Sequence, residues 1–291
     1  MSPPDPPSPP TGDVRRRSTP SSVTASRTRP VALTIAGVDS SGGAGTVADL
    51  KTFEAYGVWG AVAVTAVTAQ NTLGVQVVET LTPLIVRAQI ASVVSDLGAD
   101  AAKTGMLGSA EVVEIVVSTL AQLGVGPLVV DPVMVATTGG RLLDPDAVEA
   151  VRDLLLPLAA VVTPNLAEAA ALAGVAEIAD RQGMESAGRA LVDLGAALVM
   201  VKGGHLGGDA SPDCLVGQSG PAVWLEGHRL AADGAHGSGC VLSAAICAEL
   251  ARGMEAADAC VAAKRFVARA IEAGPALGAG VVPVDPGWQA R

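Results

Sequence analysis

Aromatic side chains are scarce in this sequence, where they make up 2% of 291 residues. Hydrophobic residues nevertheless make up 49% of the chain, so the core must be built from Val, Leu, Ile and Ala. A core of that composition favours a parallel sheet covered by helices. The length permits one large α/β domain or two smaller ones.

Long apolar runs and cysteine pairs are missing as well. No run reaches the roughly 18 residues of a membrane-spanning helix without a glycine, proline or polar break. The four cysteines form no CxxC pair and have no histidine at zinc spacing, which predicts reduced thiols in a cytoplasmic protein. A net charge of −10 argues against a broad nucleic-acid surface. We therefore expect neither nucleic acid nor a membrane as a partner.

Lysine is also rare. The four lysines are Lys51, Lys103, Lys202 and Lys264, and the first three fall within glycine-bearing motifs. Among them Lys202 stands out, because it ends an apolar run and precedes two glycines in VMVKGGH. A point cation at the end of a strand suits nucleotide phosphates.

Residues 1–30 differ in composition from the rest of the chain. They are rich in Pro, Ser and Arg and have almost nothing to bury, which predicts a disordered tail. From Val31 onward, short β-branched runs alternate with Ala- and Leu-rich helical stretches, a pattern typical of βαβ units. We expect residues 72–81 to supply an edge strand and a partial lid. Where parallel strands end in glycine or polar residues, their carboxyl ends form a ligand crevice.

The stretch AGVDSSGGAG places Asp39 in a tight turn before a run of glycines. Glycines there let the backbone approach a small ligand closely. The spacing is not the GxGxxG of dinucleotide-binding proteins, and a plain turn between strand and helix explains it equally well.

Three polar residues follow two further strand candidates. Asp131 ends a buried strand in VVDPVMVATTGG, where a carboxylate needs a cation or hydrogen-bond donors unless the Asp-Pro pair only forms a turn. Asn165 and Glu168 lie three residues apart in TPNLAEA. Spacing alone favours a capping box at a helix start, and the alternative is a site for hydrated Mg²⁺.

The stretch GAHGSGCVLSAA carries a glycine-rich loop into a helix that opens near Cys240. Free N–H groups and the helix dipole make such a helix start an anion site. A thiol at that place is expected to have a lowered pKa and to be partly ionised near neutral pH.

Seven ordered blocks between Val31 and Ala270 closely resemble the hydroxymethylpyrimidine/phosphomethylpyrimidine kinases of thiamine biosynthesis, in the ribokinase-like superfamily. The blocks are AGVDSSGGAGTVADLKTFEAYG, TAVTAQNTLGVQ, KTGMLG, VVDPVMVATTG, VVTPNLAEAAALAG, VKGGHLGGDASPD and HGSGCVLSAAICAEL. The resemblance implies one domain over residues 31–291, an α/β three-layer sandwich with a mostly parallel central sheet and helices on both faces. It implies a homodimer that uses ATP and Mg²⁺ to phosphorylate 4-amino-5-hydroxymethyl-2-methylpyrimidine and then its monophosphate.

The resemblance also implies the site residues. The catalytic residues are Gly237, Ser238 and Gly239, whose amides face the transferring phosphoryl group, and Cys240, which takes the position of the catalytic Asp of most sugar kinases. The residues that bind the substrate are Asp39, Ala44, Gln70, Met106 and Val133. The residues that bind ATP are Asp131, Asn165 and Lys202. The residues that hold Mg²⁺ are Asp131 and Glu168.

Physical chemistry agrees with two of these roles and leaves alternatives open. Gln70 carries a donor and an acceptor, so it can bind a ring nitrogen beside an exocyclic amine. Met106 offers a compliant wall to a flat ring, although core packing would be the favoured explanation without the resemblance. A pyridoxal or pyridoxine kinase of the same cysteine-bearing branch is the main alternative, followed by a non-catalytic ligand-binding relative. A Rossmann dehydrogenase is disfavoured because GxGxxG is absent.

Overall fold

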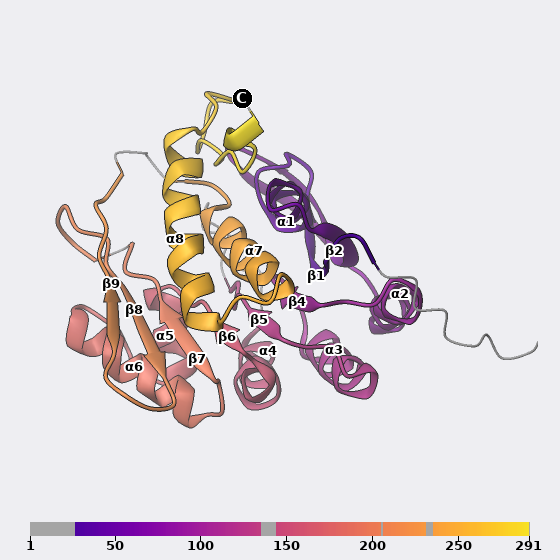
Figure 1. Cartoon of the computed structure of the whole chain (residues 1–291), viewed down its shortest axis with the longest axis horizontal. Coiled ribbons are helices and arrows are strands. Elements are labelled where there is room, and N and C mark those ends of the chain that lie inside the picture. Colours follow the sequence, from indigo (N-terminus) through magenta and orange to yellow (C-terminus); the bar gives the residue numbers. More distant parts are fainter. Residues whose placement is uncertain (1–26, 135–143, 205, 231–234, 291) are drawn as a thin grey trace, which may run out of the picture.

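Nine strands form one sheet in the centre of the protein, and helices cover both of its faces (Figure 1). The structure is a computed structural model that describes residues 27–134, 144–204, 206–230 and 235–290. The strand order is β3-β2-β1-β4-β5-β6-β7-β8-β9. The strands are β1 (Val31–Asp39), β2 (Trp59–Asn71), β3 (Gly74–Thr80), β4 (Ala101–Thr104), β5 (Leu128–Val130), β6 (Val161–Val162), β7 (Leu198–Val201), β8 (Asp213–Gly217) and β9 (Val223–Leu225).

The six strands from β2 to β7 in this order are parallel, and the outer strands are antiparallel to their neighbours. The edge strand β3 lies within the predicted residues 72–81. The six parallel strands coincide with the strands predicted from the β-branched runs VALTIAG, AVAVTAV, DAAKTG, PLVVDP, AVVTP and ALVMVKG. Strands β8 and β9, which have five and three residues, were not predicted from the sequence. Such short antiparallel strands carry too little periodicity to stand out from the glycines and prolines around them.

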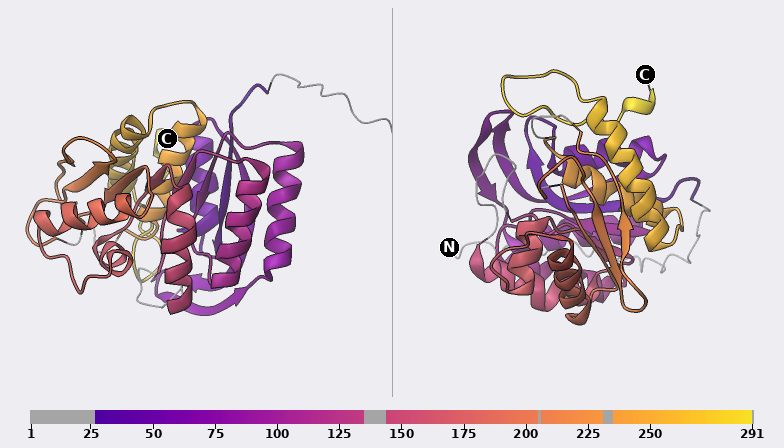
Figure 2. Two further views of the ribbon diagram at one scale, coloured as in Figure 1. Left: turned by 90° about the horizontal axis from the view of Figure 1, so that it is seen from below. Right: turned by 90° about the vertical axis from the view of Figure 1, so that its left-hand side faces the viewer.

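Two groups of helices sandwich the sheet (Figure 2). One face carries α1 (Gly45–Ala55), α7 (Ser238–Ala251) and α8 (Ala256–Glu272). The other carries α2 (Pro83–Asp96), α3 (Ala110–Leu123), α4 (Pro145–Ala150), α5 (Leu166–Ala173) and α6 (Arg181–Asp193). Within the described residues, none of these helices has the length and apolar character needed to cross a membrane.

Alternate residues of the central strands serve two separate cores. In β5, Val129 packs with the α1, α7 and α8 layer, whereas Leu128 and Val130 pack with the opposite layer. In β6, Val161 and Val162 divide in the same way. Because strand side chains alternate with a period of two, uninterrupted apolar runs fill both cores at once.

The sheet reverses its winding between β1 and β4. The chain passes from β1 to β2 on one side and later returns to place β4 on the other side of β1. The carboxyl ends of β1 and β4 therefore flank a crevice of the kind that binds ligands in open α/β sheets.

The predicted tail, residues 1–30, falls mostly outside the described residues, which begin at Arg27. Its last part contacts the domain, because Arg27 Nη2 lies 2.8 Å from Asp100 Oδ1 and Arg29 Nη2 lies 2.8 Å from Glu54 Oε2. Surface ion pairs of this kind contribute about 0–1 kcal/mol each.

A buried ion pair lies between the sheet and the helices above it. Lys103 of β4 and Asp49 of α1 are both fully buried, with Lys103 Nζ 2.9 Å from Asp49 Oδ1. Thr34 of β1 donates to the other Asp49 oxygen at 2.6 Å. Burial is the largest single effect and disfavours the ammonium, but the surrounding acidic groups, with Asp49 foremost among them, together outweigh burial and hold the pKa of Lys103 above its usual value. Both charges act on Cys240 and Cys247, so the pair underlies α7.

Candidate active site

All the site residues that the sequence predicts line one cavity of about 1670 Å³ at the carboxyl ends of the parallel strands. Pockets for one small ligand enclose roughly 300–1,000 Å³, so this cavity has room for two ligands side by side. The predicted residues on its wall are Asp39, Ala44, Gln70, Met106, Asp131, Val133, Asn165, Glu168, Lys202, Gly237, Ser238, Gly239 and Cys240.

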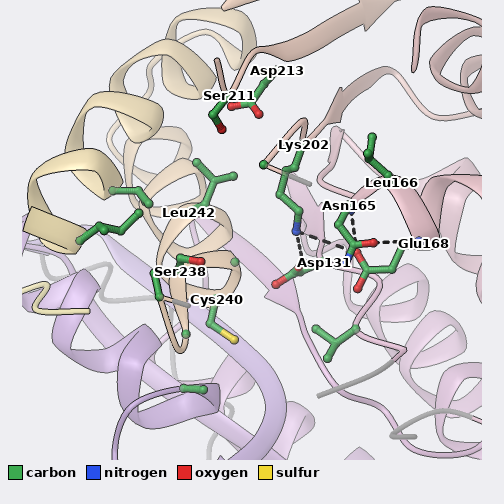
Figure 3. Close-up of a pocket in the computed structure, with 18 of the residues that line it drawn as sticks. Asp131, Asn165, Leu166, Glu168, Lys202, Ser211, Asp213, Ser238, Cys240 and Leu242 are labelled. Atoms are coloured by element: carbon green, nitrogen blue, oxygen red, sulfur yellow. Dashed lines mark hydrogen bonds and ion pairs between the residues drawn. The ribbon is translucent and has the colours of Figure 1, made fainter. Parts of the chain in front are cut away.

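Helix α7 begins at the wall of this cavity (Figure 3). Its N-cap, Gly237, has a φ of 81°, in the left-handed region that favours glycine. A Cβ atom at Gly237 would collide with the carbonyl oxygen of Gly43, so the close approach of the two loops also requires glycine. No side chain caps the helix, which leaves its first N–H groups to an external acceptor.

Three backbone N–H groups at the start of α7 are free, and one of them is not among the three that were predicted. Within the described residues, those of Gly237, Gly239 and Cys240 have no hydrogen-bond acceptor in the protein, whereas Ser238 donates its N–H to Ala235 O at 3.1 Å. The Cys240 amide therefore takes the place that the sequence analysis gave to Ser238. Three free amides at one helix N-terminus form an anion site.

The expected low pKa of Cys240 is wrong. Burial raises the pKa of this thiol to about 12. The Lys103 ammonium works in the opposite direction, whereas the carboxylates of Asp49 and Asp131 add to the increase. With its pKa raised in this way, the thiol is protonated at neutral pH.

We expect iodoacetamide to modify Cys240 slowly at pH 7 and about tenfold faster with each added pH unit up to pH 10. Only the thiolate reacts, and its fraction rises tenfold per pH unit below the pKa. Peptide mass spectrometry measures the modified fraction at each pH. A rate constant that levels off below pH 8 would contradict the raised pKa.

Lys202 lies between two acidic side chains (Figure 3). Its Nζ is 3.3 Å from Asp131 Oδ1 and 3.9 Å from Glu168 Oε2. Burial disfavours the ammonium, but the two carboxylates outweigh it and raise the pKa of Lys202. A Cβ atom at Gly239 would lie 3.4 Å from the same Nζ, so this positive charge adjoins the free amides of α7.

Asp131 has the partners that a buried carboxylate needs. It is 2% exposed, and besides Lys202 it accepts hydrogen bonds from Ser243 Oγ at 3.1 Å and Thr163 Oγ1 at 3.4 Å. The lysine contact is the functional interpretation that the sequence offered. Ser243 and Thr163 were missed, since nothing in their local motifs shows that α7 and the end of β6 meet at Asp131.

Asn165 and Glu168 form the capping box that their spacing favours. Asn165 Oδ1 accepts from the Glu168 N–H at 2.9 Å, and Glu168 Oε2 accepts from the Asn165 N–H at 2.8 Å. Burial raises the pKa of Glu168 to about 7, with Lys202 opposing and Asp131 adding to the increase. Glu168 is therefore both a helix cap and a member of the charge cluster around Lys202.

Asp39 lines the cavity near Ala44 and Gln70, and protein donors surround it. Its carboxylate accepts from Ser41 N–H at 2.8 Å, Ala44 N–H at 2.9 Å and His236 Nε2 at 2.9 Å. It therefore holds these protein groups in place, and its role in binding the substrate stays a prediction. His236 was given no role from the sequence, although a histidine inside a glycine-rich loop was a visible signal.

Known proteins resemble this chain over most of its length. The model of the family described as phosphomethylpyrimidine kinase matches residues 39–285. A hydroxymethylpyrimidine/phosphomethylpyrimidine kinase of Streptomyces coelicolor is 48% identical over 261 residues, which cover 90% of this chain and 96% of that protein.

Solved structures share the fold, which is ribokinase-like. Pyridoxal kinase from Staphylococcus aureus, in complex with AMP-PCP and pyridoxal, has a TM-score of 0.84 at 37% identity, covering 91% of this chain and 96% of its own. Phosphomethylpyrimidine kinase from Clostridium difficile has a TM-score of 0.74 at 41% identity, covering 84% of this chain and 100% of its own.

Proposed function

The chain belongs to the phosphomethylpyrimidine kinase family, and from this premise we propose that it transfers the γ-phosphoryl group of ATP to 4-amino-5-hydroxymethyl-2-methylpyrimidine and then to the monophosphate formed. It is a phosphotransferase of thiamine biosynthesis. One observation carries the proposal: the free amides of α7 and the Lys202 ammonium lie together in a cavity with room for two ligands.

Phosphoryl transfer asks a protein mainly for positioning and for stabilisation of charge on the transferring group. Amides that already point into the cavity supply that stabilisation without reorganising during the reaction. The Lys202 side chain adds a full positive charge beside Gly239. Asn165 and Asp131 extend the wall on the side that we assign to the nucleotide, and Gln70 lies on the side that we assign to the pyrimidine.

The residues around Lys202 fit a hydrated Mg²⁺. Within the described residues, no group of three or more acidic, histidine or cysteine side chains surrounds one point. Asp131 and an ionised Glu168 nevertheless leave one net negative charge after pairing with Lys202. Mg²⁺ is held through one or two carboxylates, waters and substrate phosphates, so these two side chains suffice. When bound, the ion neutralises charge on the phosphates.

We assign to Cys240 the acceptance of the hydroxymethyl proton. The proton moves from the substrate oxygen to Sγ as that oxygen bonds to phosphorus and ADP leaves. Because the thiol is protonated at rest, its active form is the minor thiolate, which the Lys103 charge favours. A base of high pKa accepts a proton strongly, which offsets part of its low abundance.

Pyridoxal is a second candidate substrate, since solved pyridoxal kinases at 36–37% identity share the fold. The test is kcat/KM for the aminopyrimidine alcohol and for pyridoxal, measured with the same enzyme and ATP. We expect the pyrimidine to be preferred at least tenfold, because Gln70 matches the edge of an aminopyrimidine. A reversed preference would replace the proposed function by pyridoxal phosphorylation.

ATP binding is supported by relatives crystallised with ADP and with AMP-PCP. A homodimer and a cytoplasmic location are also part of the proposal. Both stay predictions from the sequence, and size-exclusion chromatography with light scattering measures the first of them.

Replacing Glu168 by glutamine is expected to lower kcat about 10²-fold with little change in melting temperature. Glutamine at this position can still complete a capping box, but it removes the charge that we assign to the cation. Ser109→Ala is the matched control, because it removes the cap of α3 away from the cavity and should lower stability by about 1 kcal/mol without changing kcat. Near-normal kcat in Glu168→Gln would show that Glu168 only caps its helix.

A further inference from the structure

Asp39, Gln70 and His236 meet at the cavity wall, although they come from three separate segments. Asp39 ends β1, Gln70 lies near the end of β2, and His236 precedes α7. His236 Nε2 lies 2.9 Å from Asp39 Oδ2 and 3.3 Å from Gln70 Nε2. One ring nitrogen thus faces two side chains of different chemistry.

The Asp39 carboxylate is surrounded by donors. Besides the backbone N–H groups of Ser41 and Ala44, the Ser41 hydroxyl donates to it at 2.8 Å. Burial opposes the negative charge, but hydrogen bonds from His236 and Ser41 hold the pKa of Asp39 below its usual value. An ionised carboxylate can only accept, so Nε2 of His236 must carry a hydrogen.

The backbone of His236 holds its ring in place. Its backbone N–H donates to Val282 O at 3.0 Å and its carbonyl accepts from Val284 N–H at 3.2 Å, which fixes the residue on both sides. In the described part of the chain, Nδ1 is buried without a hydrogen-bond partner. A hydrogen on Nδ1 would therefore stay unsatisfied, whereas a bare lone pair costs less.

The hydrogen on Nε2 decides which way the Gln70 carboxamide faces. The structure places Gln70 Nε2 toward His236 and Gln70 Oε1 toward Thr68. An N–H group cannot accept from an amide NH₂, and hydrogen bonds are what distinguish the two ends of a carboxamide, so we assign its oxygen to the side of His236. The other end lies 3.2 Å from Thr68 Oγ1. That hydroxyl donates to Val38 O at 3.0 Å and keeps lone pairs for the amide NH₂.

The reverse orientation of the carboxamide leaves the network unsatisfied. It sets an N–H of Gln70 against the N–H of His236. With the oxygen toward His236, the N–H that is bound to Asp39 meets a lone pair of Gln70 instead, and the Gln70 NH₂ can donate to Thr68 Oγ1.

We propose that Asp39 and His236 are positioning residues that lock the Gln70 carboxamide in one orientation and so determine which ring edge this kinase accepts. This inference rests on the proposed function. The locked amide offers its oxygen and its N–H at fixed places, matched to a ring nitrogen beside an exocyclic amine. A ring that carries a carbonyl in place of that amine exchanges donor and acceptor, and the locked amide rejects it.

The test compares the aminopyrimidine alcohol with its 4-oxo analogue, 5-hydroxymethyl-2-methylpyrimidin-4(3H)-one. We expect the wild type to prefer the amino compound in kcat/KM by about 10²-fold or more, because a site built for one hydrogen-bond pattern rejects the other. Asp39→Asn should reduce that preference at least tenfold. A neutral amide can donate to His236, so Nε2 no longer has to carry a hydrogen and the Gln70 carboxamide can turn either way. The ratio of two substrates does not depend on the fraction of folded enzyme, so a merely structural loss leaves it unchanged.

Two further variants complete the test. Ser41→Ala removes one donor to Asp39 but keeps the contact with His236, and it should retain the preference. His236→Gln should reduce the preference as Asp39→Asn does. It replaces Asp39→Asn in the test if Asp39→Asn does not fold. A wild type that uses both compounds equally, or an unchanged preference in the two lock variants, would overturn this inference alone. A wild type that phosphorylates neither compound would overturn the proposed function.

Discussion

Replacement of Cys240 by alanine is expected to lower kcat by about 10²- to 10⁴-fold, the range for loss of a general base. The substitution removes the proton acceptor but keeps the backbone amides at the start of α7. The anion site should therefore survive, and KM for ATP should change little. Steady-state kinetics with the aminopyrimidine alcohol measure both constants.

The pH dependence of kcat provides a signature of this role. Because burial raises the pKa of Cys240 to about 12, the thiolate fraction increases tenfold per pH unit through the neutral range. Wild-type kcat should therefore rise with pH between pH 6 and 9, where chemistry is rate-limiting. Cys240→Asp should recover part of the activity lost in Cys240→Ala, and its kcat should rise at lower pH than that of the wild type, because a carboxyl group has a lower intrinsic pKa than a thiol.

Cys247→Ala is the matched control for this prediction. Cys247 is a buried thiol two turns further along α7, outside the residues that line the cavity. Its replacement should affect stability and leave both kcat and its pH profile unchanged. Nearly full turnover in Cys240→Ala would show that the thiol only packs against its neighbours. Catalysis would then depend on the amides of α7 and the charge cluster around Lys202.

Replacement of Lys103 by methionine is expected to lower the free energy of unfolding by about 3–5 kcal/mol, because it leaves the Asp49 carboxylate buried without its cation. Methionine has a similar length, so loss of packing contributes little. Urea denaturation followed by circular dichroism measures the change.

The double variant Lys103→Met with Asp49→Leu distinguishes the cost of one unpaired buried charge from the net contribution of the ion pair to the free energy of unfolding. Apolar replacements of a whole buried ion pair are often close to neutral, so the double variant should regain most of the lost stability. A cost below about 1 kcal/mol for Lys103→Met alone would contradict the ionised, fully buried pair.

The parallel strands, and the residues at their carboxyl ends, were predictable from the sequence because each strand is an apolar run of its own. Asp39, Asp131 and Lys202 each follow such a run, and parallel strands bring their ends to one edge. This local pattern was enough to place these three residues at one edge of the sheet. Ala44, Gln70, Met106 and Val133 were implied only by the family resemblance, and they line the same cavity.

The contacts between distant segments were not predictable in the same way. Lys103 and Asp49 are 54 positions apart, and nothing local shows that β4 and α1 bury them together. Lys103 lies near the end of β4, but the alternation along the strand turns its side chain under α7 rather than into the crevice.

The pKa of Cys240 shows why electrostatics need the fold. A helix N-terminus is visible in a sequence, and it lowers the pKa of a thiol. Burial, and the carboxylates of Asp49 and Asp131, come from other segments and act in the opposite direction. The sign of the shift depends on which effect is larger, and only the packed structure decides it.

The most direct test of the proposed function is a time course of products from the purified chain with ATP, Mg²⁺ and 4-amino-5-hydroxymethyl-2-methylpyrimidine. Anion-exchange chromatography separates the alcohol, its monophosphate and its diphosphate. We predict that the monophosphate forms first and then declines as the diphosphate appears, with one ADP released per phosphoryl group transferred. ATP-dependent formation of neither product, under conditions where the chain is folded, would contradict the proposed function.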